Sequence, residues 1–232
     1  MPKKSLNKPK KPSVPGNYRV SRNVKKPKPE QIEKMKREKA LKSASIDLHQ
    51  LTEDAAESYL QLKMEEKDSF VAPSYIGGKG LYVMADCIFG SVIAEYTGER
   101  LDIEQIEKEE KEQEGKYANE EYFIQSYSGN LIIDAAVSNA GVAKYANHMC
   151  APNCQFETIG LERRDGGVTE VIFIKSIKPI SMFEEIGVKY EWEVGKDDVG
   201  IVCNCRSTNC IGIIGRVNKK NLLKKIAKKE KK

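Results

Sequence analysis

The stretch Asn147-His148-Met149-Cys150-Ala151-Pro152-Asn153-Cys154 contains two of the six cysteines in this 232-residue chain. A second group lies further along, in a C-x-C-x4-C pattern formed by Cys203, Cys205 and Cys210. Three thiolates this close together, completed by a fourth donor from a distant loop, form the closed tetrahedral set that structural zinc prefers. The spacing therefore predicts a zinc site, and it leaves the fourth ligand open between Cys150 and Cys154.

The rest of the sequence indicates an intracellular protein, in which cysteine thiols stay reduced. No apolar run approaches the ~18 residues that a membrane span needs, so we expect no membrane association. The N-terminal residues MPKKSLNKPKK also lack the apolar region of a signal peptide. We therefore expect an intracellular protein whose clustered cysteines bind metal rather than form disulfides. Cys87 stands apart and is expected to be a small buried hydrophobic residue.

Charge is segregated along the chain. Residues 1–40 carry 14 Lys/Arg against 3 Asp/Glu, and residues 216–232 carry 9 against 1. The segment between them, 41–215, carries 16 against 30, a net charge of −14. Basic ends around an acidic body suit a protein whose ends contact DNA and whose body receives a basic substrate. The alternative is that both ends are only disordered and solubilising.

The composition and the residue pattern divide the chain into a basic arm, a helical segment, a β-rich body and a basic tail. Residues 1–29 are rich in Pro and Lys and predict a disordered basic arm. Residues 30–68 predict a helical lead-in, because Leu51, Ala55, Tyr59 and Leu62 recur at helical spacing around the capping residue Thr52. Residues 216–232 predict a second basic tail.

Short apolar and β-branched runs predict strands in the body. They are Leu81–Met84, Ser91–Tyr96, Tyr122–Tyr127, Leu131–Ile133 and Glu170–Lys175. Between the second and third runs, the acidic stretch Asp102–Lys116 predicts a solvated surface helix. The fold class is therefore mainly β with one inserted helix.

The order of several motifs is similar to that of one known family. N-H-x-C-x-P-N-C at 147–154 resembles the signature of SET-domain lysine methyltransferases, and the other family motifs flank it in order. They are Gly78-Lys79-Gly80-Leu81, Glu95-Tyr96-Thr97-Gly98-Glu99, Tyr122-Phe123, Ile133-Asp134-Ala135, Glu184-Glu185-Ile186-Gly187-Val188-Lys189-Tyr190, and the segment Cys203–Cys210. A single motif of this kind would carry little weight, but this many in one order is specific.

The resemblance implies a SET domain at 69–193 and a zinc-bound post-SET segment at 194–215. It implies several small sheets with a knot-like C-terminal crossing. It also implies that Cys150 is the fourth zinc ligand beside Cys203, Cys205 and Cys210, which leaves Cys154 as a packed thiol. The basic runs Lys3–Lys11 and Lys219–Lys232 predict localisation to the nucleus, in association with chromatin.

The same resemblance assigns the reaction and its residues. The implied activity is transfer of a methyl group from S-adenosylmethionine to a lysine, with a histone tail or nucleosome as substrate. The implied cofactor residues are Gly78, Lys79, Gly80, Asn147, His148 and Tyr190. Tyr190 and Tyr122 are the implied catalytic residues. Without the family, both tyrosines would be half-buried strand aromatics, and His49 is expected to be an ordinary surface residue.

Four positions depart from the family pattern. Lys144 stands at a usual Arg, and Phe183 stands at a usual Gly, where we expect a different backbone conformation. Val188 stands where Phe or Tyr tunes the number of methyl groups, and Lys189 replaces a usual Asp.

These departures favour, as an alternative, a catalytically weak SET domain that acts as a chromatin scaffold. A zinc-ribbon nucleic-acid binder is a third and weaker hypothesis. The sequence does not choose between a channel and a core role for Trp192, and it leaves the oligomeric state open.

Overall fold

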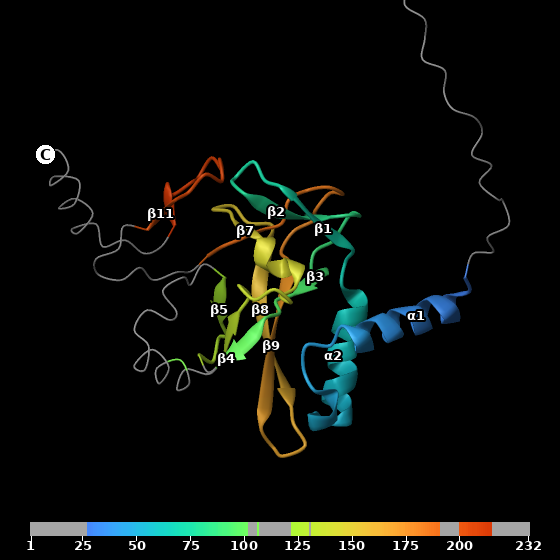
Figure 1. Cartoon of the computed structure of the whole chain (residues 1–232). Helices are drawn as coiled ribbons and strands as arrows, with labels where there is room; N and C mark the ends of the chain where they lie inside the picture. Colours follow the sequence, from blue (N-terminus) through green and yellow to red (C-terminus); the bar gives the residue numbers. More distant parts are fainter. Residues whose placement is uncertain (1–26, 102–105, 107–121, 130, 191–199, 215–232) are drawn as a thin grey trace, which may run out of the picture.

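The computed structural model describes residues 27–101, 106, 122–129, 131–190 and 200–214. In this part of the chain, small sheets form the body. The second of two helices lies along one side of the body, and the first points away from it (Figure 1). The mainly β fold class predicted from the sequence is confirmed. Among the described residues, no helix combines the length and apolar character needed to cross a membrane.

The helical segment comprises α1 (Pro29–Lys42), the 3-10 turn η1 (Leu48–Gln50) and α2 (Glu53–Glu65). Thr52 caps α2, because its hydroxyl accepts a hydrogen bond from the Ala55 amide at 3.3 Å. Tyr59 is fully buried on the face of α2 that packs on the body. The helix predicted from spacing and cap is confirmed.

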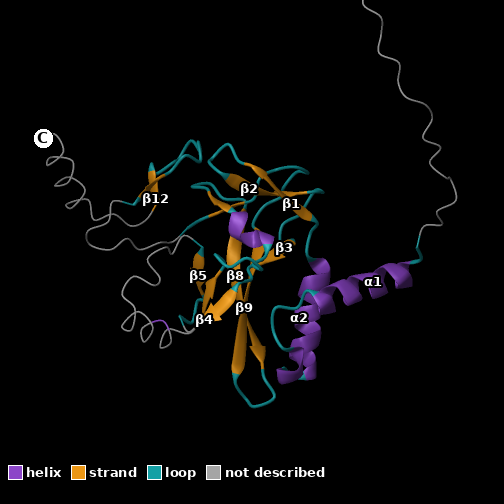
Figure 2. Cartoon of the chain, viewed as in Figure 1, coloured by secondary structure: helices purple, strands orange, loops and turns teal. Residues whose placement is uncertain are grey.

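Twelve strands are present in the described residues, and they form five small sheets (Figure 2). Two-stranded sheets pair β1 (Ser69–Pro73) with β2 (Lys79–Val83), β7 (Asn147–His148) with β10 (Gly187–Val188), and β11 (Ile201–Val202) with β12 (Ile213–Ile214). The order β3-β9-β8 joins Val92–Glu95, Val168–Ser176 and Cys154–Glu162. The order β4-β6-β5 joins Glu99–Leu101, Ile132–Asp134 and Phe123–Gln125.

All five predicted strands are present, as β2, β3, β5, β6 and β9, with ends shifted by one or two residues. The sequence reading missed β1, β4 and β8 and the two-residue strands β7, β10, β11 and β12. The long strand β8 was hidden because it begins inside the cysteine signature and contains Gly160. The predicted helix Asp102–Lys116, the basic ends 1–26 and 216–232, and Trp192 lie outside the described residues, apart from residue 106.

The short strands β7 and β10 run parallel side by side, and this pair of strands is named here the crossing. Asn153 reinforces the pair, because its side-chain oxygen accepts a hydrogen bond from the Gly187 amide at 2.8 Å. A side chain at position 187 would collide with Met149, so glycine permits this close approach. The crossing thereby brings the signature residues 147–150 beside the segment that leads to Tyr190.

A buried polar network fastens α2 to β3. The Glu95 carboxylate, on a residue 4% exposed, accepts hydrogen bonds from the hydroxyls of Tyr59 at 2.9 Å and Ser45 at 2.5 Å. The Lys63 ammonium lies 3.2 Å from the same carboxylate and 2.7 Å from Glu66. Because the charges are paired and the oxygens are hydrogen-bonded, this acid is satisfied inside the protein.

Phe183 corrects one expectation. We expected the turn before Glu184 to change its conformation when glycine is replaced, but Phe183 adopts φ 66°, in the left-handed region that favours glycine. Its amide donates to the Val83 carbonyl at 2.9 Å, and its ring meets Phe70 edge-on with centroids 6.1 Å apart. These contacts hold Phe183 in a backbone conformation that is unfavourable for a residue with a side chain.

Candidate functional site

Asn147 joins the glycine turn before β2 to the crossing. Its side-chain amide donates to the Lys79 carbonyl at 2.9 Å and to the Glu185 carboxylate at 2.7 Å. Gly78 lies in the turn at φ 60°, and the space where its side chain would point is open. The structure therefore brings together the predicted residues Gly78, Lys79 and Asn147.

Glu185 is a residue to which the sequence reading gave no role, although it stands in the quoted motif. It is 4% exposed and accepts hydrogen bonds from the Ser74 hydroxyl at 2.7 Å, the Tyr82 hydroxyl at 3.2 Å and Asn147. A side chain on Gly80 would collide with this carboxylate. Gly80 thus leaves room for the Glu185 carboxylate beside β2. One buried carboxylate positions both the glycine turn and Asn147.

His148 links the crossing to Tyr190. Its Nδ1 accepts a hydrogen bond from the Tyr190 amide at 2.9 Å, and the two rings meet edge-on with centroids 5.5 Å apart. Burial, with a smaller contribution from the Lys189 charge, lowers the pKa of His148. The neutral ring is the form that can accept at Nδ1 while Nε2 faces the Cys150 sulfur at 3.4 Å. His49, by contrast, is an exposed residue of η1, as predicted.

Three tyrosines pack around the main core beside this link. The Tyr96 hydroxyl donates to the Tyr122 carbonyl at 2.8 Å, and the Tyr190 hydroxyl donates to the Ala146 carbonyl at 2.7 Å. Burial raises the pKa of Tyr190 to about 12, and Tyr122 adds a smaller contribution. Tyr122 and Tyr190, predicted as the catalytic pair, both pack against the same core cluster.

Lys144 places a positive charge among these rings. Its ammonium donates to the Ala135 carbonyl at 2.9 Å and lies 5.6 Å from the ring centroids of Tyr122 and Tyr145. The lysine that replaces a usual Arg therefore uses its single charged group on backbone carbonyls and aromatic faces. Its position shows that these rings accommodate a cation.

The four predicted zinc ligands meet at one point. The sulfurs of Cys150, Cys203, Cys205 and Cys210, named here the thiol cluster, all lie within 4.8 Å of one another. Cys150 is 3.7 Å from Cys203 and 4.0 Å from Cys210. Zinc–sulfur bonds of about 2.3 Å at tetrahedral angles require sulfurs about 3.8 Å apart, so the geometry fits zinc.

The surroundings of the thiol cluster also fit a metal site. The backbone amides of Ile211 and Gly212 point at the sulfurs of Cys150 and Cys210, each at 3.4 Å, and such donors stabilise thiolate ligands. Cys154 lies elsewhere, fully buried, and burial raises the pKa of its thiol to about 12. Cys154 is thus the packed thiol that we expected, as is Cys87 at 3% exposure.

These features define a class of mainly β protein. In this class, a pair of short parallel strands connects a glycine turn, a tyrosine cluster and a four-cysteine site. The family model of the SET domain matches residues 78–191. The chain belongs to the SET-domain family.

The curated relatives agree with this assignment. The chain is 32% identical over 162 residues to histone-lysine N-methyltransferase trr of Drosophila melanogaster, covering 69% of this chain and 6% of the relative. It is 31% identical over 164 residues to the H3 lysine-4 specific histone-lysine N-methyltransferase of Saccharomyces cerevisiae, covering 70% and 14%. With Set2 of Drosophila melanogaster the identity is 33% over 142 residues, covering 59% and 6%. The similarity therefore spans only a small part of these relatives.

Proposed function

We propose that this protein is an S-adenosylmethionine-dependent protein-lysine N-methyltransferase that acts on a histone lysine. The observation that carries the proposal is the linked set Lys79–Asn147–His148–Tyr190, joined by hydrogen bonds across three segments of the chain. The names of the curated relatives support the same activity. Bound S-adenosylmethionine would supply the electrophilic methyl group on its sulfonium.

The residues that would hold the cofactor are Gly78, Lys79, Gly80, Asn147, His148 and Tyr190. The side chains of Asn147 and His148 are engaged with protein groups, so they position the backbone of the cofactor pocket. The open space beside Gly78 and the aromatic faces of Tyr122 and Tyr190 fit a cationic ligand with an amino-acid end. The Glu185 carboxylate holds Asn147 in this arrangement by accepting a hydrogen bond from its side-chain amide.

Tyr190 is suited to guide the transfer without acting as a base. Its hydrogen is committed to the Ala146 carbonyl, so the hydroxyl oxygen presents lone pairs to an electron-poor methyl group. Tyr122 would line the channel for the substrate amine. A free lysine has a pKa near ~10.4, and burial beside a sulfonium charge would lower it and favour the neutral nucleophile.

The thiol cluster would bind one zinc ion with a structural role. Cys150 follows His148 closely in the chain, while the other three ligands come from the C-terminal segment. Zinc would therefore fasten that segment to the loop carrying Asn147 and His148. Tyr190 and Ile76 pack against a small apolar cluster that contains Cys203 and Cys205, which would connect the metal site to the proposed channel.

The decisive experiment is transfer of labelled methyl from S-adenosylmethionine to a histone mixture and then to a single peptide. Tyr190→Phe should lower turnover ~10²–10³-fold, as when one preorganised polar group is removed, with little change in cofactor affinity. His148→Ala should instead weaken cofactor binding. If Tyr190→Phe turns over like the parent, the role assigned to this hydroxyl is wrong.

A catalytically weak scaffold is the second candidate, favoured by Val188, which is fully buried in the core cluster that Tyr122 and Tyr190 contact. A smaller residue here widens the channel, and Val188→Phe should reduce the number of methyl groups added, as measured by product mass. If the parent transfers nothing to any histone while still binding nucleosomes, the scaffold function replaces the enzymatic one.

We further propose that the basic ends direct the protein to the nucleus and bind nucleosomal DNA. The runs Lys3–Lys11 and Lys219–Lys232 combine import-signal composition with salt-sensitive attachment to phosphates. Deleting both should release the protein from chromatin and the nucleus. A deleted form that stays nuclear and chromatin-bound would contradict this proposal.

A further inference from the structure

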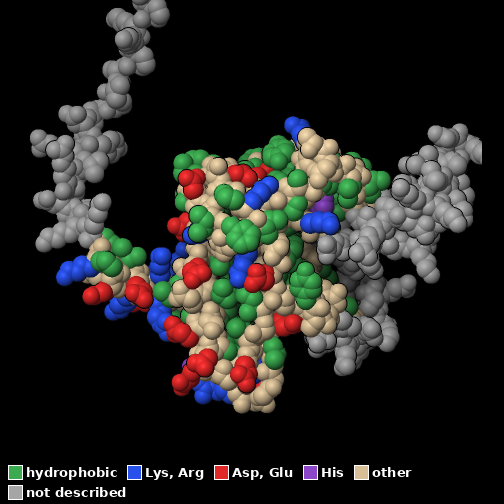
Figure 3. Space-filling model, turned by 180° about the vertical axis from the view of Figure 1, so that it is seen from behind, with side chains coloured by type: hydrophobic (Ala, Val, Ile, Leu, Met, Phe, Trp, Pro, Cys, Tyr) green, Lys and Arg blue, Asp and Glu red, His purple; other side chains and the backbone are tan. Residues whose placement is uncertain are grey.

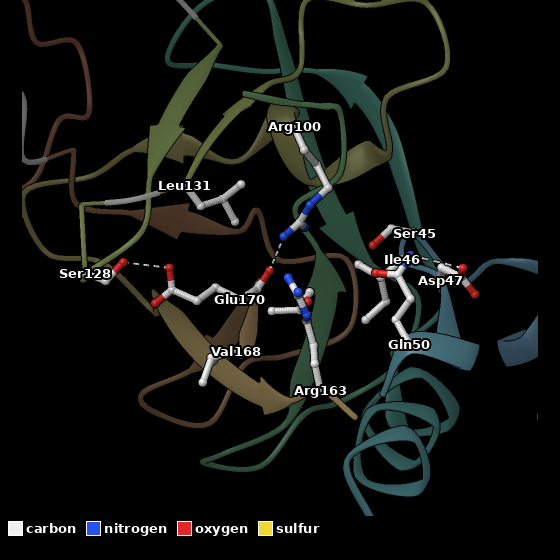
Figure 4. A pocket seen from close by; sticks show the side chains of 11 residues that line it. Ser45, Ile46, Asp47, Gln50, Arg100, Ser128, Leu131, Arg163, Val168 and Glu170 are labelled. Atoms are coloured by element: carbon white, nitrogen blue, oxygen red, sulfur yellow. Dashed lines mark hydrogen bonds between the residues drawn. The ribbon is translucent and has the colours of Figure 1, made fainter. Parts of the chain in front are cut away.

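A cavity of about 680 Å³ lies between the helical segment and the body, formed by residues other than those of the proposed cofactor site. Its walls come from the α1–α2 connection, β4, the β5–β6 turn and the β8–β9 hairpin (Figure 4). This volume falls within the ~300–1,000 Å³ range of ligand sites. The cavity is thus large enough to admit a side chain with its neighbours.

Two arginines reach into the cavity from opposite walls, and Figure 4 shows their guanidinium groups pointing toward one another. Arg100 donates to the Glu170 carbonyl at 2.5 Å. Within the described ranges, no carboxylate forms an ion pair with Arg100. Burial lowers its pKa, although the charges of Glu95 and Glu170 partly oppose this effect. A largely desolvated cation therefore borders the cavity.

The carboxylates near the cavity already have partners. Asp47 accepts from the His49 amide at 3.0 Å and from the Gln50 side chain at 3.3 Å. Glu170 accepts from the Ser128 hydroxyl at 2.7 Å, and Asp165 pairs with Arg163. Asp165 accepts hydrogen bonds from Nε and Nη2 of Arg163. An additional oxyanion between the two guanidiniums would therefore pair with Arg100 and meet the remaining Nη1 group of Arg163.

The remaining wall indicates what kind of molecule carries this oxyanion. Ile46, Leu131 and Val168 give the cavity an apolar side, and Val168 is 62% exposed at its rim. Asp47 and Glu170 would repel a polyanion such as nucleic acid. A single carboxylate matches the two arginines, and an apolar side chain next to it matches the apolar wall of the cavity.

The geometry points to a docking site for an acidic peptide segment of a partner protein, with one Asp or Glu carboxylate between Arg100 and Arg163. An apolar residue next to this acid packs on Ile46, Leu131 and Val168. The bound segment bridges the helical segment to the sheet whose strand β5 follows Tyr122. The site thereby gives the chain a partner contact separate from methyl transfer.

The test uses the full chain with ¹⁵N-labelled arginine and two capped dipeptides, acetyl-Glu-Leu-amide and acetyl-Gln-Leu-amide. The Glu peptide should shift the Nε–H signals of Arg100 and Arg163, and the Gln peptide should bind at least about tenfold more weakly, because a charge-assisted pair is lost. Arg163→Gln, at a partly exposed position, should weaken binding of the Glu peptide by a similar factor. Arg37→Gln, on α1 in an exposed pair with Glu57, is the matched control and should leave binding unchanged.

Equal binding of the two peptides, or binding of neither, would overturn the proposal. Inorganic phosphate forms a third arm of the experiment. If phosphate shifts both arginine signals while the Glu peptide does not, the site takes a phosphate-bearing ligand and the acidic-peptide proposal is wrong. Arg100→Gln is measured together with its thermal unfolding, because loss of the buried guanidinium can also change stability.

Discussion

The thiol cluster and the Glu95 network are two sites where the fold gathers potentially anionic groups, and they differ in how the charge is balanced. Glu95 is surrounded by a lysine and two hydroxyls, all supplied by the chain. The thiol cluster brings four sulfurs together with backbone amides, and no Lys or Arg is in hydrogen-bond contact with these sulfurs among the described residues. The first site is complete within the protein, whereas the second has the geometry of a site for an external cation.

On the surface, by contrast, acidic and basic side chains are interspersed over the described body, as Figure 3 shows from behind. Charges at such exposed positions contribute little to stability, because water and salt screen them. The large effects should therefore come from the two buried sites. Their sizes should differ because, of the two, only the thiol cluster is proposed to bind an ion from solution.

The largest effect should follow removal of the metal. Purified protein should contain close to one zinc per chain, and a strong chelator should unfold the segment 200–214, since structural zinc contributes about 10–16 kcal/mol of apparent binding free energy in small domains. Cys150→Ser should lose the zinc, while Cys154→Ser should retain it. Metal analysis and limited proteolysis measure both results. The reverse pattern would show that Cys154 is the fourth ligand.

The Glu95 network should give the next largest effect. Lys63→Met leaves the carboxylate buried without its cation and should cost about 3–5 kcal/mol of unfolding free energy. The matched control is Lys39→Met, because the Lys39–Asp68 pair is 74% and 77% exposed and should contribute at most about 1 kcal/mol. Denaturant unfolding compares the two variants. Similar losses would mean that burial does not set the energy of the Glu95 network.

The same contrast explains what the sequence could predict. Cys203, Cys205 and Cys210 form a spacing pattern, and the resemblance to a family pointed to Cys150, which is the member of the Cys150/Cys154 pair that lies in the thiol cluster. The Glu95 network has no such pattern, because Ser45, Lys63 and Glu95 meet only after α2 packs on β3. Local periodicity in the sequence predicted α2 and five strands. It could not predict a strand such as β8, because the burial of β8 is set by its pairing with β9 and not by a pattern within its own residues.

Glu185 tests the part of the proposed site that the sequence did not reveal. Glu185→Gln keeps the shape but replaces one acceptor oxygen with a donor, so Ser74, Tyr82 and Asn147 compete for fewer lone pairs. We expect S-adenosylmethionine to bind about tenfold more weakly, with little change in turnover at saturation. Titration calorimetry measures the affinity. The exposed Glu162→Gln is the control and should bind like the parent.

The smallest effect concerns pH. Burial raises the pKa of Tyr190 to about 12, so its hydroxyl stays neutral well beyond the usual tyrosine value, and its hydrogen bond to Ala146 persists across pH 7–10. The rate of methyl transfer should therefore follow only the deprotonation of the substrate lysine in this range. Tyr190→Phe should lower the whole pH–rate profile without changing its shape. A break below pH 10 that is present in the parent and absent from Tyr190→Phe would mean that this tyrosine ionises during turnover and acts as a base, because removing a hydroxyl that stays neutral removes no titration.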